Sequence, residues 1–233
     1  MQPTRSIDRK SDEIFLAEKE MGNMNKKALT NPELFKFYDK KNKDDFFGSN
    51  QRWFPTTWQR LSGCGSCAAS NIYYYLTYLN NTLGKKYNSR KEWVSLMEEL
   101  WKYVKPSLRG VNKLEMFYNP MLEFAKTKGM DLTYHFCEVP EEVYYRPTFQ
   151  KVIDFLSKAL DKDLPVAFLN WCNGEVKNLD RWHWVTIIEL GYDLEKEWAY
   201  VNILDEGRFK TIDLALWLKS TKLGGGFLYF EFA

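Results

Sequence analysis

The apolar residues of this chain change their spacing at residue 130, and this change limits the folds that the chain can adopt. Before it they recur at helical intervals, and after it most segments have the composition of strands. The expected helices span 66–80, 89–104, 111–129, 146–163 and 213–220. The expected strands span 130–139, 164–171, 181–192, 197–205 and 224–233. This order predicts an α+β fold, with a helical lobe at about 64–129 packed on an antiparallel sheet lobe at about 130–233.

The first 45 residues lack this patterning, since they are polar and rich in lysine. Within them, NPELFKFYDKKNK at 31–43 predicts a short helix, because Asn31 can cap it and Pro32 suits its first turn. Proline and glycine also mark the third long helix, which Pro120 is expected to interrupt and Gly129 to end. We therefore expect a polar, partly helical arm over 1–45 and one domain over 46–233.

The charge of the chain is almost balanced, with 33 basic and 31 acidic residues and a net charge of +2. This balance argues against a nucleic-acid partner. The N-terminus has no apolar core of a signal peptide, and no apolar run reaches the ~18 residues of a membrane helix. We therefore expect a cytoplasmic protein without a membrane partner, whose four cysteines are thiols rather than a disulfide framework.

Two of these cysteines, Cys64 and Cys67, lie among small residues where a helix begins. A helix N-terminus favours anions, so a thiol there has a lowered pKa and reacts as thiolate. The flanking glycines, Gly63 and Gly65, permit sharp backbone angles and the close approach of a substrate. The segment therefore predicts a nucleophilic cysteine.

A nucleophilic cysteine requires a base, and the chain has only two histidines. His183 begins a strand after a long polar loop, which suggests the edge of a cleft. If the following hairpin turns at Leu194 and Glu195, His183 faces Asp205 or Glu206, and Asn202 lies one pleat away. We expect Asp205 to orient the imidazole, with Asn202 as the alternative, and we interpret His135 as structural.

Four segments together resemble a known family: GCGSCAASNIYYYL, LPVAF, HWVTIIELGY and YVNILDEG. They are similar to the papain-like cysteine peptidase superfamily, above all to the double-glycine leader (bacteriocin-processing) peptidases and their uncharacterised bacterial relatives. The likeness spans about 53–233. It implies a papain-like fold and a Cys-His-Asp triad that hydrolyses an amide or thioester, or transfers an acyl group. It implies a peptide or acyl-carrying substrate and requires neither a cofactor nor a metal.

The resemblance also bears on the choice of nucleophile. The leader-peptidase register implies Cys64, whereas the C-G-S-C register of papain itself implies Cys67. Papain-type enzymes place an oxyanion glutamine six residues before the nucleophile, where this chain has Trp58 for Cys64, with Gln59 one position late. We favour Cys64 with Gln59 as oxyanion donor, and keep Cys67 as the alternative.

Two other interpretations remain open at this point. The same fold could be a catalytically inactive binding or structural module, since the oxyanion glutamine is displaced. A zinc domain is the less favoured interpretation, with Cys64, Cys67, His135 and Cys137 as four ligands of suitable type. If the chain is an enzyme, the aromatic side chains Trp182 and Trp184 are expected to bind the substrate.

Overall fold

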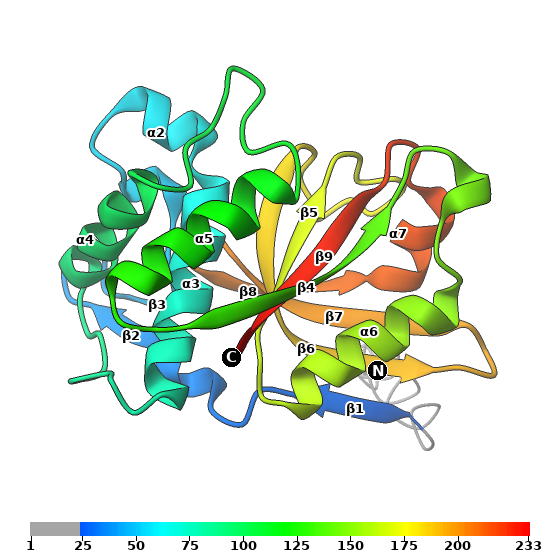
Figure 1. Cartoon of the computed structure of the whole chain (residues 1–233), viewed down its shortest axis with the longest axis horizontal. Helices are drawn as coiled ribbons and strands as arrows, with labels where there is room; N and C mark the ends of the chain where they lie inside the picture. The colour runs from blue at the N-terminus through cyan, green and yellow to red at the C-terminus, as the bar shows by residue number, and fades with distance from the viewer. Residues whose placement is uncertain (1–23) are drawn as a thin grey trace, which may run out of the picture.

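The computed structural model describes residues 24–233, so the first part of the expected arm, 1–23, lies outside the described residues. The strands are β1 (Asn25–Ala28), β2 (Lys36–Asp39), β3 (Asp44–Phe47), β4 (Leu132–Val139), β5 (Val166–Asn170), β6 (His183–Asp193), β7 (Trp198–Asp205), β8 (Arg208–Asp213) and β9 (Gly225–Phe232). The large sheet has the order β4-β9-β5-β6-β7-β8, with β1 also paired to β6, while β2 and β3 form a separate hairpin (Figure 1). All of these strand pairs are antiparallel.

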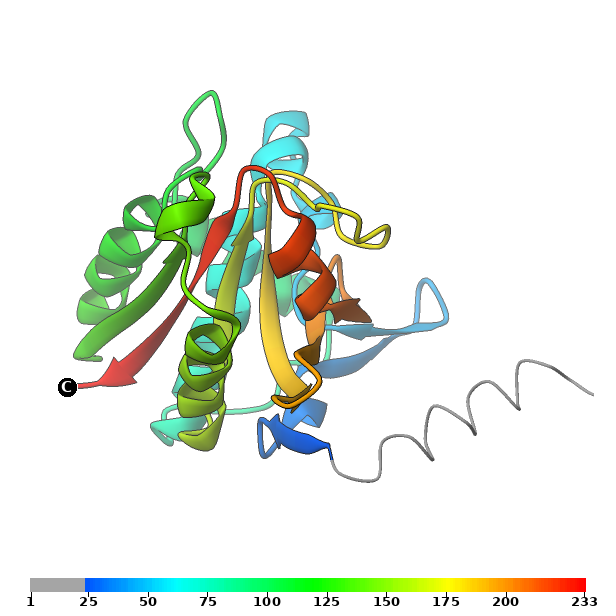
Figure 2. The same ribbon diagram turned by 90° about the vertical axis from the view of Figure 1, so that its right-hand side faces the viewer.

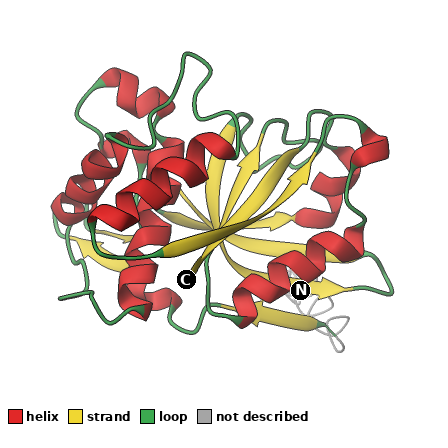
Figure 3. Ribbon diagram, viewed as in Figure 1, coloured by secondary structure: helices red, strands yellow, loops and turns green. Residues whose placement is uncertain are grey.

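The α-helices are α2 (Thr57–Ser62), α3 (Cys64–Leu79), α4 (Arg90–Trp101), α5 (Glu115–Thr127), α6 (Phe149–Asp161) and α7 (Leu214–Ser220). Three short 3-10 turns accompany them: η1 (Pro32–Phe35), η2 (Gln51–Trp53) and η3 (Val143–Tyr145). Helices α2 to α5 gather on the left of the view in Figure 3, beside the strands of the large sheet. The architecture is α+β, as the order of the sequence patterns predicts.

Helices cover both faces of the sheet, as neighbouring residues of β9 demonstrate. Successive strand residues point to opposite faces. Phe230 stacks toward Phe117 of α5, whereas Tyr229 packs on Phe155 of α6. Helix α7 lies on the α6 face, because its Trp217 contacts Phe227 of β9. Figure 2 views the molecule from the side of α6 and α7, with α3 behind the sheet.

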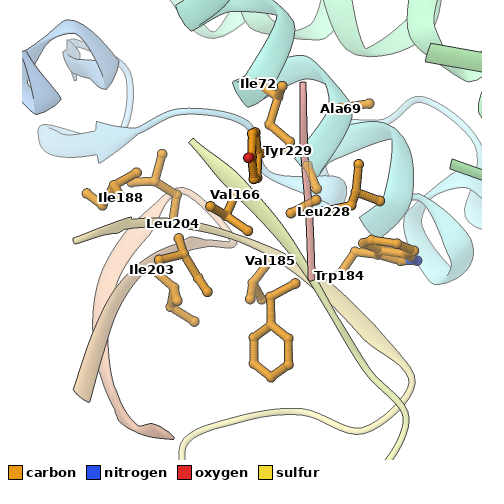
Figure 4. Close-up of a cluster of buried hydrophobic side chains, with 14 of the residues drawn as sticks. Ala69, Ile72, Val166, Trp184, Val185, Ile188, Ile203, Leu204, Leu228 and Tyr229 are labelled. Carbon is orange, nitrogen blue, oxygen red and sulfur yellow. The ribbon is translucent and has the colours of Figure 1, made fainter. Parts of the chain in front are cut away.

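The core forms where α3 lies across the sheet. Figure 4 shows Ala69 and Ile72 of α3 beside Leu228 of β9 and side chains of β5, β6 and β7. Ala69 and Ile72 are completely buried. The small side chain of Ala69 lets the helix approach the strands closely, so the end of α3 that carries Cys64 is held firmly against β6.

The described part of the arm corrects the expected helix at 31–43. Only Pro32–Phe35 forms a 3-10 turn, and Lys36–Asp39 is a strand. The reason is the burial of Phe35 and Phe37, which alternate with exposed or half-buried residues and so follow the period of a strand. Strand β1 pairs with β6, so residues 25–28 of the expected arm add a strand to the large sheet.

Helix α5 and the β6–β7 hairpin also differ from expectation. Pro120 does not interrupt α5, which runs from Glu115 to Thr127. The hairpin loop spans 194–197, because Asp193 pairs with Trp198, so the expected register is wrong. A β-bulge between Ile187 and Glu189 shifts the pairing again before the strand reaches His183. Strand β8 and helix α2 were not expected from the sequence.

None of the helices among the residues that the structure describes is both long and apolar enough to cross a membrane.

Candidate functional site

Cys64 is the first residue of α3, directly after a tight junction with α2. Helix α2 ends at Ser62, and Gly63 joins the two helices. A Cβ atom on Gly63 would lie 2.5 Å from the Phe54 ring and from the Gln59 carbonyl oxygen, so only glycine fits without a shift. Cys64 is 9% exposed and lies at the end of α3 where unpaired N–H groups favour a thiolate.

His183 binds Asp205 at the start of β6. The ring Nε2 lies 2.7 Å from Asp205 Oδ1, and both residues are buried. The pairing of β6 with β7 differs from the expected one, and on this side it ends at the pair Thr186 and Leu204. The side chains of His183 and Asp205 meet just beyond that pair. Nε2 is bound to Asp205, so the other ring nitrogen, Nδ1, is the one left for a second partner. Cys64 lines the same small cavity as His183, and each of the two groups shifts the pKa of the other.

The charges of these groups act on one another. Burial opposes ionisation of the Cys64 thiol, but the hydrogen bond and charge of His183, with backbone N–H groups of Trp184 and Gly65, outweigh it and lower the pKa. Burial also opposes a charged His183, but Asp205 and then Cys64 outweigh it and raise the pKa to about 10. The arrangement therefore favours a thiolate beside an imidazolium.

Cys67, the alternative nucleophile, lies one helical turn further along α3. Burial, and then the neighbouring Cys64, raise the pKa of its thiol well above the ordinary value. Its carbonyl accepts a hydrogen bond from Ser49, and Asn71 joins Ser49 to Thr186 of β6. This end of α3 is thus tied to the sheet through Asn71, while the Cys67 thiol stays protonated.

Two cavities reach Cys64. One is very small, about 10 Å³, and lies between Cys64, His183 and Asp205. The other is a cleft of about 220 Å³, lined by apolar side chains such as Trp58 and Leu108. A larger groove of about 960 Å³ between α7 and the β6–β7 turn has no cysteine or histidine in its walls. The largest of these three cavities is therefore not the one that contains the reactive side chains.

The structure corrects the expected oxyanion residue. The side-chain oxygen of Gln59, Oε1, accepts hydrogen bonds from the backbone N–H and the hydroxyl of Thr56 in a capping box of α2. Gln59 lines neither cavity at Cys64. Gln51, which the sequence analysis missed, lines the small cavity instead. Its Oε1 is buried without a hydrogen-bond partner among the residues described. A buried amide oxygen without a partner is an acceptor that still requires a donor, so the Gln51 amide has hydrogen-bonding capacity left inside this cavity.

Two further expectations need correction. Asn202 does not approach His183, because its amide donates to Glu189 and its oxygen accepts from Thr211. The Trp184 indole does not form an open substrate wall. It is 3% exposed, donates to the Val111 carbonyl oxygen and stacks on Phe117, so it belongs to the core, at whose edge Figure 4 shows it.

Trp182, in contrast, lines the 220 Å³ cleft together with Cys64 and is 56% exposed. Its backbone has φ of +53°, in the left-handed region that a tryptophan rarely adopts. Such a conformation costs free energy and is often retained at functional sites. Asn170 of β5 supports the same region, because its amide donates to the Asp180 carbonyl oxygen while its own oxygen accepts from Trp217.

The expected zinc ligands do not come together. His135 lies on β4, stacks on Tyr229 and pairs with Glu231, so neither it nor Cys137 joins Cys64. In the part of the chain that the structure describes, the group with metal-ligand chemistry is Asp180, His183 and Asp205. Two of these three are already bound to each other, so the zinc interpretation of the C-x-x-C segment is wrong.

No family model matches the chain, and neither does any curated protein. The crystal structure of UfSP from C. elegans superposes on it with a TM-score of 0.49 and 10% sequence identity. The match covers 89% of this chain and 34% of UfSP, so this chain spans about a third of the length of UfSP. A likeness of this extent decides neither the fold family nor the function.

Proposed function

We propose that the chain is a papain-like cysteine hydrolase, with Cys64 as nucleophile, His183 as base and Asp205 as the residue that orients His183. The observation that carries the proposal is the buried His183 ring, which is hydrogen-bonded to Asp205 and lines the same small cavity as Cys64. Nucleophile, base and orienting group in mutual contact form the arrangement that covalent acyl transfer requires. The order of the three residues along the chain agrees with the resemblance of the sequence to the papain-like superfamily.

The proposed reaction has two steps. The Cys64 thiolate attacks the carbonyl carbon of an amide or thioester, and the His183 imidazolium gives its proton to the departing amine or thiol. An acyl-thioester on Cys64 and a neutral imidazole result. His183 then takes a proton from water, whose oxygen attacks the thioester, and the acid is released with the thiolate restored. An amine in place of water would give acyl transfer.

We assign the oxyanion site to Gln51 rather than Gln59. A developing oxyanion is stabilised by donors fixed before the reaction begins, and one such donor contributes about 3–4 kcal/mol. The Gln51 side chain lines the small cavity shared with Cys64 and His183, and its amide N–H₂ group is the donor that the assignment requires. Together with N–H groups at the start of α3, it would face the carbonyl oxygen of a substrate bound at Cys64.

The cleft beside Cys64 favours a peptide or acyl-carrying substrate with a large apolar group. Trp58, Leu61, Leu108 and Trp182 are exposed apolar side chains that all line it. Its volume of about 220 Å³ exceeds the ~150 Å³ of a cavity that holds benzene, so one aromatic or branched side chain fits. Trp182 is therefore the substrate-binding residue that we retain from the sequence analysis.

Within the superfamily, we place the chain in the double-glycine leader peptidase-like branch and propose a bacterial, cytoplasmic protein. The support is the GCGSCAAS start of α3 and the HWVTIIELGY strand, since both occur in the order and context of that branch.

The test is capture of the acyl-enzyme. The protein would be mixed with p-nitrophenyl acetate, quenched in acid, digested and analysed by mass spectrometry. We expect an acetyl group on the peptide at Cys64, retained in Cys67→Ser and absent in Cys64→Ser. Acetylation at Cys67 alone would move the nucleophile, and equal slow labelling of every thiol would leave the fold without this activity.

A further inference from the structure

A lysine on the unexpected strand β8 reaches the same carboxylate as His183. Lys210 Nζ lies 2.6 Å from Asp205 Oδ2, while His183 Nε2 lies 2.7 Å from Oδ1. Both oxygens of Asp205 therefore have a charged or chargeable partner. The Asp205 side chain is 2% exposed and that of Lys210 is 29% exposed, so the ammonium group reaches inward from the surface.

We propose that Lys210 is a positioning residue for the reaction at Cys64: it fixes the Asp205 carboxylate so that one oxygen faces His183, and its charge balances the buried triad. This inference rests on the proposed function. It assigns to Lys210 no contact with the substrate, because the lysine acts through Asp205.

The charge balance gives the physical reason for this assignment. A thiolate, an imidazolium and a carboxylate carry one net negative charge, and burying a net charge is costly unless a partner neutralises it. Lys210 supplies the missing positive charge directly at Asp205. The active pair of Cys64 and His183 is then part of a neutral buried group.

The other charged groups around the site do not supply this balance. Arg52 and Glu206 pair with each other at 3.0 Å, so their charges largely cancel. Asp180, just before β6, is exposed and negative, and therefore adds to the deficit. On α3, burial raises the pKa of Cys67, which keeps this thiol neutral. Lys210 is thus the cation among the described residues that pairs directly with the triad.

This role predicts a change in pH dependence rather than only in rate. Removing a nearby positive charge makes every neighbouring acid hold its proton more strongly. Without Lys210, both the Cys64 thiol and the His183 imidazolium should therefore lose their protons at higher pH. A residue that merely supported the fold would lower the rate without moving the midpoint.

The experiment measures the rate of Cys64 alkylation by iodoacetamide across pH, resolved by site with mass spectrometry. In Lys210→Met we expect the midpoint for Cys64 to move up by about one pH unit. Lys210→Arg, which keeps the charge, should stay close to the wild type. Lys162→Met is the matched control, since Lys162 also pairs with a carboxylate, Glu231, on β9; it should leave the profile unchanged.

The outcomes separate this inference from the function on which it rests. If wild-type Cys64 itself reacts only near the ~8.5 of a free thiol, the proposed function fails whatever Lys210 does. If wild-type Cys64 reacts at low pH and Lys210→Met has the same midpoint, the function stands and the role of Lys210 is overturned. Lys210→Gln, neutral but polar, replaces the methionine variant if that variant does not fold.

Discussion

Two regions of the large sheet each bring a histidine, a cysteine and a carboxylate to neighbouring positions, but their environments differ. Where β6 begins, His183 is buried between Asp205 and Cys64. On β4, His135 is more than one-third exposed at its side chain and lies 3.2 Å from Glu231. Cys137, two residues further along β4, is buried.

The two thiols differ accordingly. Burial raises the pKa of Cys137, and the charge of Lys151 only partly opposes this increase. Burial acts in the same direction on Cys64, but there the His183 hydrogen bond and two backbone N–H groups reverse the outcome. The comparison teaches that a cysteine close to a histidine in sequence is not thereby reactive. The thiol must lie where charge and donors offset its loss of hydration.

Removing His183 should have the largest effect on the difference in reactivity between Cys64 and Cys137. In His183→Ala, the Cys64 thiol loses its cationic partner and should react as a free or buried thiol does. A thiol with a pKa of ~8.5 is only about 0.3% ionised at pH 6, so alkylation of Cys64 at pH 6 should slow, with about 300-fold as the upper limit set by a fully ionised wild-type thiol. The rate is measured by site-resolved mass spectrometry after a timed quench.

His135→Ala is the matched control from the other region. It should leave the Cys64 rate at its wild-type value, while Cys137 reacts slowly in every variant. A fall of similar size in His135→Ala would mean that the effect reports general damage to the fold, and the contrast between the regions would disappear.

Variants of Gln51 and Gln59 test which of the two glutamines belongs to the candidate site. Gln51→Ala should slow hydrolysis of p-nitrophenyl acetate by about a hundredfold, because a donor to the oxyanion is lost. Gln59→Ala should leave the rate almost unchanged but destabilise the protein by about 1 kcal/mol, because it breaks the capping box of α2. Rate assays together with urea unfolding separate the two effects, and a reversed pattern would return the oxyanion role to Gln59.

Sequence reasoning predicted which residues of the candidate site lie together better than it predicted their exact geometry. Cys64 was recognisable because small residues and a helical pattern surround it, and His183 because histidines are rare in the chain. The contact between His183 and Asp205 is present although the predicted hairpin register is wrong. The bulge after Ile187 could not be foreseen, since nothing in the local residue types requires an extra residue there.

The missed residues depend on contacts between distant segments. Gln51 was overlooked because counting back from Cys64 assumes a fixed spacing, whereas α2 occupies 57–62 between η2 and α3. Lys210 was overlooked because β8 is short, and its side chains are mostly polar and partly exposed. Its contact with Asp205 forms only when β8 pairs with β7 and brings the lysine to that carboxylate. Local propensity does not encode such pairings.

The pH dependence of stability tests whether the pair at the first region is ionic. The contribution of His183, whose pKa is raised from 6.5 to about 10, is complete below 6.5 and is lost as pH rises to about 10. The contribution of Cys64, whose pKa is lowered from 9.0, is complete above 9.0 and is lost as pH falls through the folded value. Between 6.5 and 9.0 the two changes cancel, since folded and unfolded chains each bind one proton on this pair.

We therefore expect the free energy of unfolding to show no pH dependence from this pair over that range. Above 9.0 it should fall by about 1.4 kcal/mol per pH unit until His183 titrates. The difference between wild type and His183→Gln in urea unfolding isolates the pair, because other groups cancel. A fall that already begins at pH 6.5 would mean that His183 is charged while Cys64 remains a thiol. Cys137→Ser, from the second region, should follow the wild type below pH 9.0. Above it the fall should be less steep, because the variant lacks a thiol whose pKa is raised in the folded protein.

An exposed aromatic from each region provides the smallest and most discriminating test. Trp182 is 56% exposed with φ of +53°, and Phe136 on β4 is 50% exposed in a regular strand. Trp182→Gly removes the left-handed strain, so we expect the free energy of unfolding to rise by about 0.5 kcal/mol. Phe136→Gly should lower it by about 1 kcal/mol, because glycine weakens a strand.

The same two variants should differ in how Cys64 recognises an aromatic group. We compare alkylation of Cys64 by chloroacetamide and by its N-phenethyl derivative, which share one electrophile. Trp182→Gly should lose a few-fold of the preference for the aromatic reagent, whereas Phe136→Gly should keep it. If Trp182→Gly is more stable than the wild type but prefers the aromatic reagent less, the wild type keeps a strained backbone at Trp182 because this side chain binds the aromatic group. If Trp182→Gly instead loses stability and keeps the preference, Trp182 is a structural side chain and the cleft has another specificity determinant.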